Sequence, residues 1–216
     1  MYYPPVEVKV WGDLACFTRP EMKVERASYP VMTPSAARGV LEAIFWKPEF
    51  QWEVREIRVL RPIRYFSMLR NEVKSRASYR RAQQRIKGGE GYFADEDRTQ
   101  RHTLALRDVA YIITADVALR PGVNEEATKF RDQFRRRVEH GQCYIVPYLG
   151  CREFAAHFAE PDGKEQPLDL TEDLGLMLFD LKYQGAGSSR GEPYFFMARL
   201  EHGILRVPPA LYPRRV

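Results

Sequence analysis

Arginine dominates the basic residues of this chain, and its side chain suits phosphate and base recognition. Arginine and lysine together number 34 against 29 acidic residues, and 26 of the 34 are arginines. The guanidinium group binds phosphate oxygens in a fork and stacks on bases, whereas lysine is a hydrated point charge. With 12% aromatic residues and a net charge of +5, the composition suggests a nucleic-acid partner, and a merely soluble basic protein fits it equally well.

The strongest concentration of positive charge lies between Arg70 and Lys87, where seven basic residues accompany one acidic residue. We predict a mobile basic loop or hairpin there. Tyr79, Tyr92 and Phe93 could stack on unpaired bases. Seven carboxylates between residues 160 and 180 have the opposite charge, so we expect that stretch to face away from a nucleic acid or to contact a protein partner.

Other chemistry is poorly represented in the sequence. The three cysteines, Cys16, Cys143 and Cys151, form no CxxC pair, and the four histidines are scattered. This pattern predicts reduced thiols in a cytoplasmic protein, with no metal and no cofactor. No apolar stretch approaches the length of about 18 residues that a membrane span needs, so we expect no membrane association.

The first half of the chain predicts a strand, a helix and a second strand. Residues 6–11 alternate apolar and charged side chains, as a half-buried strand does. Thr33 is a suitable N-cap, and Pro34 suits the first helical position of a helix that ends before Pro48. Residues 52–60 alternate with one slip and predict the next strand, and residues 63–68 are expected to extend the sheet.

The second half repeats this order and adds further strands. A long strand is predicted at about 103–119, a helix from a cap at Asn124 to Gly141, and a final strand near 152–158. We therefore predict an α+β fold, with a ferredoxin-like domain at 1–158 that carries a basic insertion at about 66–102. Residues 159–216 are expected to form a small separate antiparallel β-sheet domain, with strands at 176–183, 194–200 and 204–207.

Several segments, taken together and in order, resemble one family. They are residues 17–26, 33–39, 44–48, 70–73, 98–103, 106–109, 141–143 and 147–154. The sequence is similar to the CRISPR-associated Cas5d family (subtype I-C, or Dvulg) of the RAMP superfamily. The resemblance covers about residues 6–158 and continues more loosely to the end of the chain.

This resemblance implies a function in RNA processing. Family members bind the CRISPR repeat in precursor RNA, cut it at the base of its hairpin and stay on the 5′ handle in a surveillance complex with other subunits. The cut needs no metal, because the ribose 2′-OH attacks the adjacent phosphorus and leaves a 2′,3′-cyclic phosphate. Such chemistry requires a base, an acid and a cation that stabilises the phosphorane.

The resemblance also assigns catalytic positions, and this chain departs from two of them. The family uses a Tyr, Lys and His set, and the matching residues here are Phe45, Lys129 and Phe130. Lys129 is therefore predicted to stabilise the phosphorane. His102 is the first choice to transfer the missing proton, because it lies in a basic segment; Tyr29 and His140 are the alternatives.

RNA-binding residues are predicted from their charge and their position in polar stretches. They are Lys23, Arg26, Arg70, Lys74, Arg76, Arg98, Arg101, Arg136 and Arg137. Three functions remain open at this point: an endoribonuclease, a subunit that binds the RNA handle but has lost catalysis, and a protein that binds duplex DNA.

Overall fold

The computed structural model describes residues 4–22, 24–75, 78–86, 93–183 and 191–212. Within these residues the chain forms an α+β fold built on one nine-stranded sheet, with the order β6-β1-β5-β3-β9-β8-β7 and with β2 and β4 both paired to β5. The elements are β1 (Val6–Ala15), β2 (Arg26–Ala27), α1 (Pro34–Ile44), β3 (Phe50–Val59), β4 (Tyr65–Val73), α2 (Tyr79–Ile86), β5 (Arg98–Leu119), α3 (Ala127–Glu139), β6 (His157–Ala159), β7 (Glu172–Tyr183), β8 (Gly191–Glu201), β9 (Ile204–Arg206) and a 3₁₀ turn (Pro209–Leu211).

Strand β5 is the longest element of the sheet, with 22 residues. One of its edges pairs with β2 and then β1, and the other edge pairs with β4 and then β3. Residues 109–115 of β5 are buried almost without interruption, because this half of the strand has neighbours along both edges and on both faces. The strand therefore holds the body of the sheet together.

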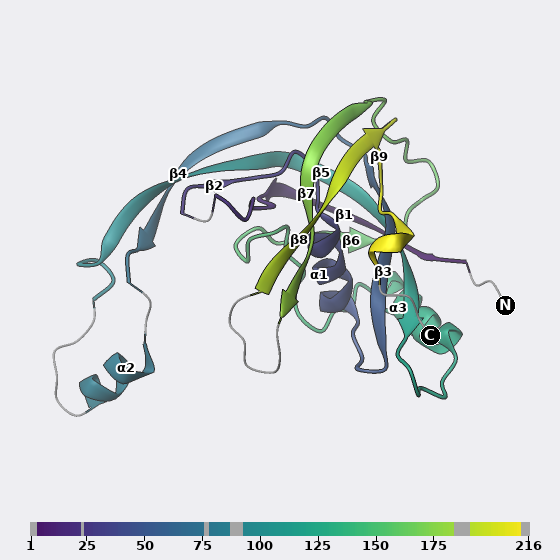
Figure 1. Cartoon of the computed structure of the whole chain (residues 1–216), viewed down its shortest axis with the longest axis horizontal. Helices are drawn as coiled ribbons and strands as arrows, with labels where there is room; N and C mark the ends of the chain where they lie inside the picture. Colours follow the sequence, from purple (N-terminus) through teal and green to yellow (C-terminus); the bar gives the residue numbers. More distant parts are fainter. Residues whose placement is uncertain (1–3, 23, 76–77, 87–92, 184–190, 213–216) are drawn as a thin grey trace.

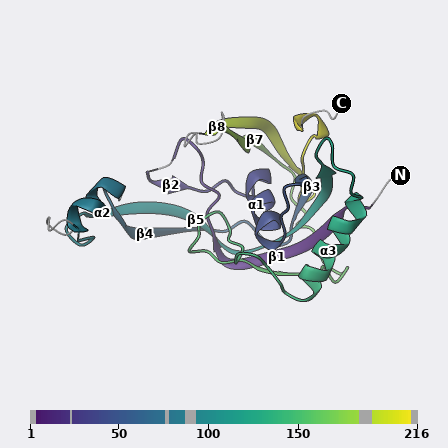
Figure 2. The same cartoon turned by 90° about the horizontal axis from the view of Figure 1, so that it is seen from below.

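Helix α1 forms where the sequence predicts it. Thr33 is the N-cap, and its hydroxyl accepts a hydrogen bond from the Ala36 N–H at 3.2 Å. The apolar stripe of α1, which includes Val40, Leu41 and Ile44, is buried against β3 and β7. The sheet curls so that β7 and β8 return over the helix (Figure 2). Arg38 Nη2 donates to Asp180 Oδ1 at 2.8 Å and ties α1 to β7.

Two boundaries differ from the sequence prediction. Helix α3 begins at Ala127 after Glu126, which is the N-cap without a side-chain capping bond, so Asn124 is not the cap. The last predicted strand, near 152–158, is short: β6 comprises only His157–Ala159. Residues 151–153 turn instead, and the Phe154 N–H donates back to the Cys151 carbonyl at 2.9 Å.

The C-terminal strands are present but do not form a separate sheet. Strand β9 pairs with β8 and, on its other edge, with β3, so that Ile57 lies opposite Leu205. An open edge of β3 would leave its backbone N–H and C=O groups without partners. Pairing with β9 satisfies them and makes β7, β8 and β9 a continuation of the main sheet.

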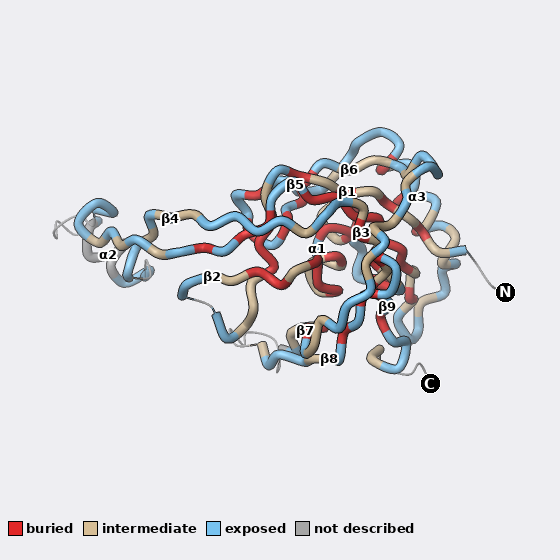
Figure 3. Tube along the Cα trace, turned by 90° about the horizontal axis from the view of Figure 1, so that it is seen from above, coloured by how far each residue is buried: buried red, intermediate tan, exposed pale blue. Residues whose placement is uncertain are grey.

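The basic insertion predicted at about 66–102 is a hairpin arm. Strands β4 and β5 pair from Tyr65↔Leu106 to Val73↔Arg98, and α2 lies in the connection between them. Figure 1 shows this arm extending away from the body, with α2 at its far end. Figure 3 shows buried residues concentrated around α1 and mostly exposed residues along the arm. The arm thus presents a large surface to solvent.

The helices within the part of the chain that the structure describes do not reach the length and apolar character that a bilayer crossing demands.

Gly203 fixes the contact between the β8–β9 turn and residues 168–170. Its φ is +74°, and a Cβ there would lie 2.2 Å from the Leu168 carbonyl oxygen. Gly163 has a similar φ of +77° but open space around it.

We predict that Gly163→Ala lowers the unfolding free energy by about 1 kcal/mol through backbone strain alone. Gly203→Ala should cost at least about 3 kcal/mol, because it adds a steric clash.

Urea denaturation of both variants measures this difference. Equal losses in the two variants would contradict the close packing of Gly203 on Leu168.

Candidate nucleic-acid interface

Lys129 lies in the first turn of α3 and points into solvent, with a side chain that is 58% exposed. Its Nζ lies 2.7 Å from the Glu125 Oε2 atom. The start of a helix carries partial positive charge, which adds to the charge of the ammonium group. Because exposed ion pairs contribute little free energy, a phosphate can replace Glu125 as the partner of Lys129. This position suits a group that stabilises a charged phosphorane.

Aromatic side chains form a buried wall beside Lys129. The Phe50 ring lies 5.7 Å from Phe45 and 5.1 Å from Phe130, measured between ring centroids. Phe45 and Phe130 are 2% and 3% exposed. The ammonium group of Lys129 lies 5.9 Å from the Phe130 ring centroid. The two positions at which the sequence departs from the expected catalytic set therefore carry core side chains.

The predicted partner His102 does not lie near Lys129. It is exposed on the arm, opposite Leu69 of β4. Helix α3 follows the other end of β5, and a strand of 22 residues spans roughly 70 Å of chain at about 3.3 Å per residue. Figure 1 shows the arm and α3 on opposite sides of the body. The structure thus separates the two predicted catalytic residues.

The alternative proton carriers are also poorly placed. Tyr29 is buried, its hydroxyl oxygen accepts a hydrogen bond from the Leu178 N–H at 3.2 Å, and burial raises the pKa of its phenol. His140 follows the last turn of α3, and its Nδ1 lies 2.7 Å from the Arg136 carbonyl oxygen. Neither side chain lies next to the start of α3.

The predicted RNA-binding residues separate into three groups. Lys74, Arg98 and Arg136 have exposed side chains, two on the arm and one on α3. Lys23 and Arg76, together with the predicted stacking residue Tyr92, lie outside the described residues. The remaining four are partly buried and have identified protein partners.

Two of these four, Arg26 and Arg70, connect the arm to the body, and Arg101 forms an ion pair within the arm. Arg26 of β2 and Arg101 of β5 share one carboxylate, that of Glu72, at 3.5 and 3.3 Å. Arg70 pairs with Glu153 in the turn before β6. Two cations on a single carboxylate leave a net positive charge at the base of the arm. These arginines can attract phosphate, but each also has a structural role.

Arg137 has a different position from its neighbour Arg136. Its Nη1 donates to the Ile44 carbonyl oxygen at 3.0 Å, and its guanidinium carbon lies 5.4 Å from the Phe45 ring centroid. The last carbonyls of α1 have no partner within the helix. Arg137 satisfies one of them and joins α1 to α3.

Trp46 and Lys47 were not among the residues predicted from the sequence, and both are exposed in the turn after α1. They follow Phe45 directly, and the Phe50 N–H donates to the Lys47 carbonyl at 3.5 Å. An exposed lysine therefore lies in the segment that joins Phe45 to Phe50. The sequence could have indicated both residues, because a basic and an aromatic side chain stand next to each other in segment 44–48, one of the segments that resemble the family.

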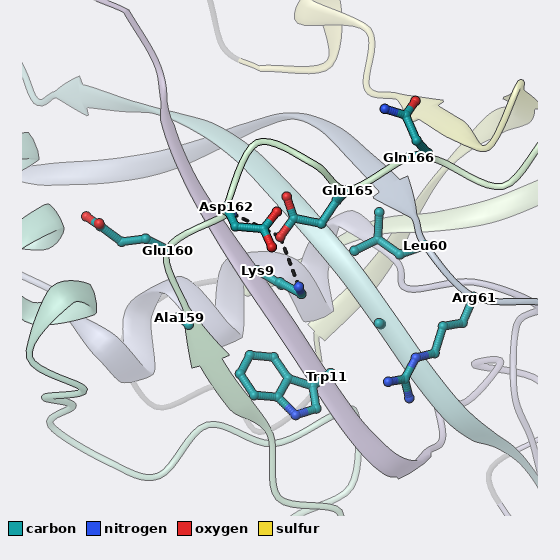
Figure 4. A pocket seen from close by; sticks show the side chains of 10 residues that line it. Lys9, Trp11, Leu60, Arg61, Ala159, Glu160, Asp162, Glu165 and Gln166 are labelled. Atoms are coloured by element: carbon teal, nitrogen blue, oxygen red, sulfur yellow. Dashed lines mark hydrogen bonds and ion pairs between the residues drawn. The ribbon is translucent and has the colours of Figure 1, made fainter.

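The acidic segment 160–166 lies over the sheet face opposite α1. Lys9 Nζ donates to Glu165 Oε1 at 2.9 Å, and a cavity of about 430 Å³ lies between this segment, Trp11 and Arg61 (Figure 4). Burial alone would raise the pKa of Glu165, but hydrogen bonds from Lys9 and from the Asp162 N–H lower it to about 2. This face is therefore an unfavourable path for RNA phosphates.

Comparison with known proteins identifies the family. A model of the CRISPR-associated protein (Cas_Cas5) family, in its Cas5d form, matches residues 6–208. The chain belongs to the Cas5d family of CRISPR-associated proteins. A protein of Thermus thermophilus that is named "CRISPR pre-crRNA endoribonuclease Cas5d" is 49% identical over 96% of this chain and 93% of its own length. A protein with the same name from Mannheimia succiniciproducens is 44% identical over 94% of this chain and 95% of its own length.

Solved structures share this Cas5d fold at low sequence identity. A crystal structure of a CRISPR-associated protein superposes with a TM-score of 0.67 at 20% identity, covering 96% of this chain and 94% of its own. A functionally uncharacterized protein from Streptococcus mutans gives 0.66 at 20% identity, with coverage of 95% and 92%. At this identity the similarity concerns the fold alone.

Metal binding has no obvious place in the described part of this Cas5d chain. Among residues whose positions are described, no three His, Cys, Asp or Glu side chains gather as they do around a metal ion.

Adjacent arginines on α3 should behave differently. We predict that Arg137→Ala lowers the unfolding free energy by about 1.5–3 kcal/mol, because it removes a charged donor to a buried carbonyl and a cation–π contact. Arg136→Ala, the matched control, should change it by less than about 0.5 kcal/mol. Chemical denaturation of both variants measures this, and a stable Arg137→Ala protein would contradict the structural role of Arg137.

Proposed function

We propose that this protein is an endoribonuclease that cuts CRISPR precursor RNA within the repeat. It then stays on the 5′ handle as a subunit of the type I-C surveillance complex. The observation that carries this proposal is the 49% identity, over 96% of the chain, to a protein named for that activity. The exposed cations on the arm and on α3 support it, because they can bind phosphates on both sides of the body.

We assign Lys129 to contact with the reacting phosphate. The 2′-OH attacks the adjacent phosphorus, the P–O5′ bond breaks, and a 2′,3′-cyclic phosphate and a 5′-hydroxyl result. Negative charge builds up on the phosphorane oxygens, and the Lys129 ammonium stabilises it once the phosphate has displaced Glu125. The low polarity of the Phe45–Phe50–Phe130 wall strengthens this interaction.

One RNA molecule is proposed to contact both the arm and α3. The repeat binds along the arm through Lys74 and Arg98, and His102 lies on the same hairpin. We therefore assign His102 to RNA contact rather than to proton transfer, since it lies on the far side of the body from Lys129. Arg136 on α3 binds a phosphate near the cut.

The scaffold of this activity is proposed to be a ferredoxin-like unit formed by residues 1–158, to which residues 159–216 add further strands. The strand order β6-β1-β5-β3 with α1 and α3 as its crossover helices supports this assignment. We place the protein in the cytoplasm, which the free thiols of Cys16, Cys143 and Cys151 support.

A second candidate function is a subunit that binds the handle without cutting it. The burial of Phe45 and Phe130 favours it, because neither side chain can transfer a proton and both belong to the core. Duplex DNA binding is a separate possibility that only the exposed basic surface supports. The same RNA and DNA assays distinguish these functions.

Cleavage at protein excess in EDTA tests the proposal, with end-labelled repeat RNA as substrate. We predict a single cut whose 5′ fragment ends in a 2′,3′-cyclic phosphate. A 2′-deoxy substitution at the cut nucleotide should abolish cleavage and preserve binding. Lys129→Ala should slow the cut by about 10²–10³-fold, as the loss of one transition-state donor does.

Lys164→Ala, which removes an exposed ammonium group from the acidic segment, is the matched control and should cut at the normal rate. His102→Ala should weaken RNA binding and leave the rate of the bound complex within about threefold. Retained binding without cleavage by the unsubstituted protein would favour the non-catalytic function. Normal cleavage by Lys129→Ala would refute the assigned site, and equal affinity for unrelated duplex DNA would favour the DNA-binding function.

A further inference from the structure

Two cysteines that are far apart in the sequence lie together at the base of the arm. Cys16 ends the β1 region, and its N–H donates to the Leu149 carbonyl at 3.0 Å. Gly150 packs so closely that a Cβ at this position would lie 2.1 Å from the Cys16 carbonyl oxygen, and its φ is +85°. This contact brings Cys151 Sγ to 3.9 Å from the same oxygen. The two backbones are therefore fixed with their thiols next to each other.

The Cys151 thiol also faces a cation. Arg26 Nη1 donates to Cys151 Sγ at 3.2 Å, while Nη2 of the same guanidinium lies 3.5 Å from Glu72. The hydrogen bond from the Cys16 thiol lowers the pKa of Cys151 below its ordinary value; burial opposes this effect, and the hydrogen bond from Arg26 adds to it. Glu153 opposes this effect through its negative charge. The pKa of the Cys16 thiol is raised, chiefly by its hydrogen bond to Cys151, with burial next.

We propose that Cys16 and Cys151 form a redox-sensitive pair that closes into an intramolecular disulfide under mild oxidation. The Cys151 thiolate attacks one oxygen of hydrogen peroxide, which gives a sulfenic acid and hydroxide. The Cys16 sulfur then attacks the sulfenic sulfur, the S–S bond forms, and the second oxygen leaves as water. Two thiols and one peroxide thus give one disulfide and two water molecules.

The position of the pair explains why small oxidants should react with it selectively. Cys151 is 4% exposed and Cys16 is fully buried, whereas the third thiol, Cys143, is partly exposed and lies outside the pair. A sulfenic acid on Cys151 would meet the Cys16 thiol before any external thiol. Bonded sulfurs lie about 2.05 Å apart, so closing the bridge requires the two sulfurs, which share a hydrogen bond, to approach each other.

Oxidation also changes the surroundings of Arg26. The disulfide carries no negative charge, so the guanidinium keeps Glu72 as its anionic partner and loses the thiolate. Arg26 can then bind a phosphate more readily at the base of the arm. This consequence rests on the proposed RNA-binding function, whereas formation of the disulfide does not.

Intact mass spectrometry of the full-length protein, after treatment with hydrogen peroxide, tests the pair. We expect the wild type to lose the mass of two hydrogen atoms and dithiothreitol to restore it. Cys143→Ser, the matched control, should give the same product, and Cys16→Ser and Cys151→Ser should not. In Cys143→Ser, trypsin should release residues 10–23 and 138–152 as one cross-linked peptide, whose only cysteines are Cys16 and Cys151.

The pH dependence of the initial rate tests the thiolate itself. In Cys143→Ser the midpoint should lie below the usual pKa of a cysteine thiol, and Arg26→Gln should move it upward, because this change removes the cation. A plot of the logarithm of the repeat-RNA binding constant against the logarithm of the salt concentration should be steeper for the oxidised than for the reduced protein. The slopes should differ by about 0.7–0.9, which corresponds to one more phosphate contact.

Oxygen addition without a disulfide, or a bridge that includes Cys143, would overturn the proposal. A disulfide that leaves RNA binding unchanged would overturn the link to Arg26. Failure of both redox forms to bind repeat RNA would instead refute the proposed function, and the mass measurement would still decide the fate of the thiol pair.

Discussion

Hydrogen bonding along both edges of β5 is the constraint on which the rest of the structure depends. This strand pairs with β1, β2, β3 and β4, and no other described strand pairs with as many neighbours. Its C-terminal half forms the centre of the body, while its N-terminal half leaves the body and becomes one side of the arm. The length of β5 therefore determines the separation between the basic arm and α3, and with it the extent of the surface that RNA can contact.

Positive and negative side chains lie on different parts of the molecule. Exposed cations lie on the arm and on α3, paired arginines hold the base of the arm, and the carboxylates of residues 160–166 lie on the sheet face opposite α1. The ion pair of Arg26 with Glu72 ties β2 to the arm, and phosphate binding by the same guanidinium is our proposal. Beside Lys129, the buried Phe45 and Phe130 provide a low-polarity wall but no group that transfers protons.

Local signals in the sequence predicted local structure well. Thr33 and Pro34 gave the start of α1, and the slip in the alternation of residues 52–60 corresponds to a register shift between Val54 and Glu56. Contacts between distant segments could not be predicted from the sequence. The pairing of β9 with β3 and the contact of Arg26 with Cys151, 125 residues away, depend on tertiary packing. Lys129 was assigned from the family resemblance, which gives no distances. Its separation from His102 follows from the length of β5, because α3 and the arm lie at opposite ends of that strand.

The most direct test of this account is the salt dependence of repeat-RNA binding for Arg98→Ala, Arg136→Ala and the double variant. If one RNA spans the arm and α3, each single variant lowers the log–log slope by about 0.7–0.9 and the double variant lowers it by about twice that amount. Arg199→Ala on β8 serves as the control and leaves the slope unchanged. A slope that responds to only one of the two sites would contradict the claim that β5 sets the span of a single RNA-binding surface.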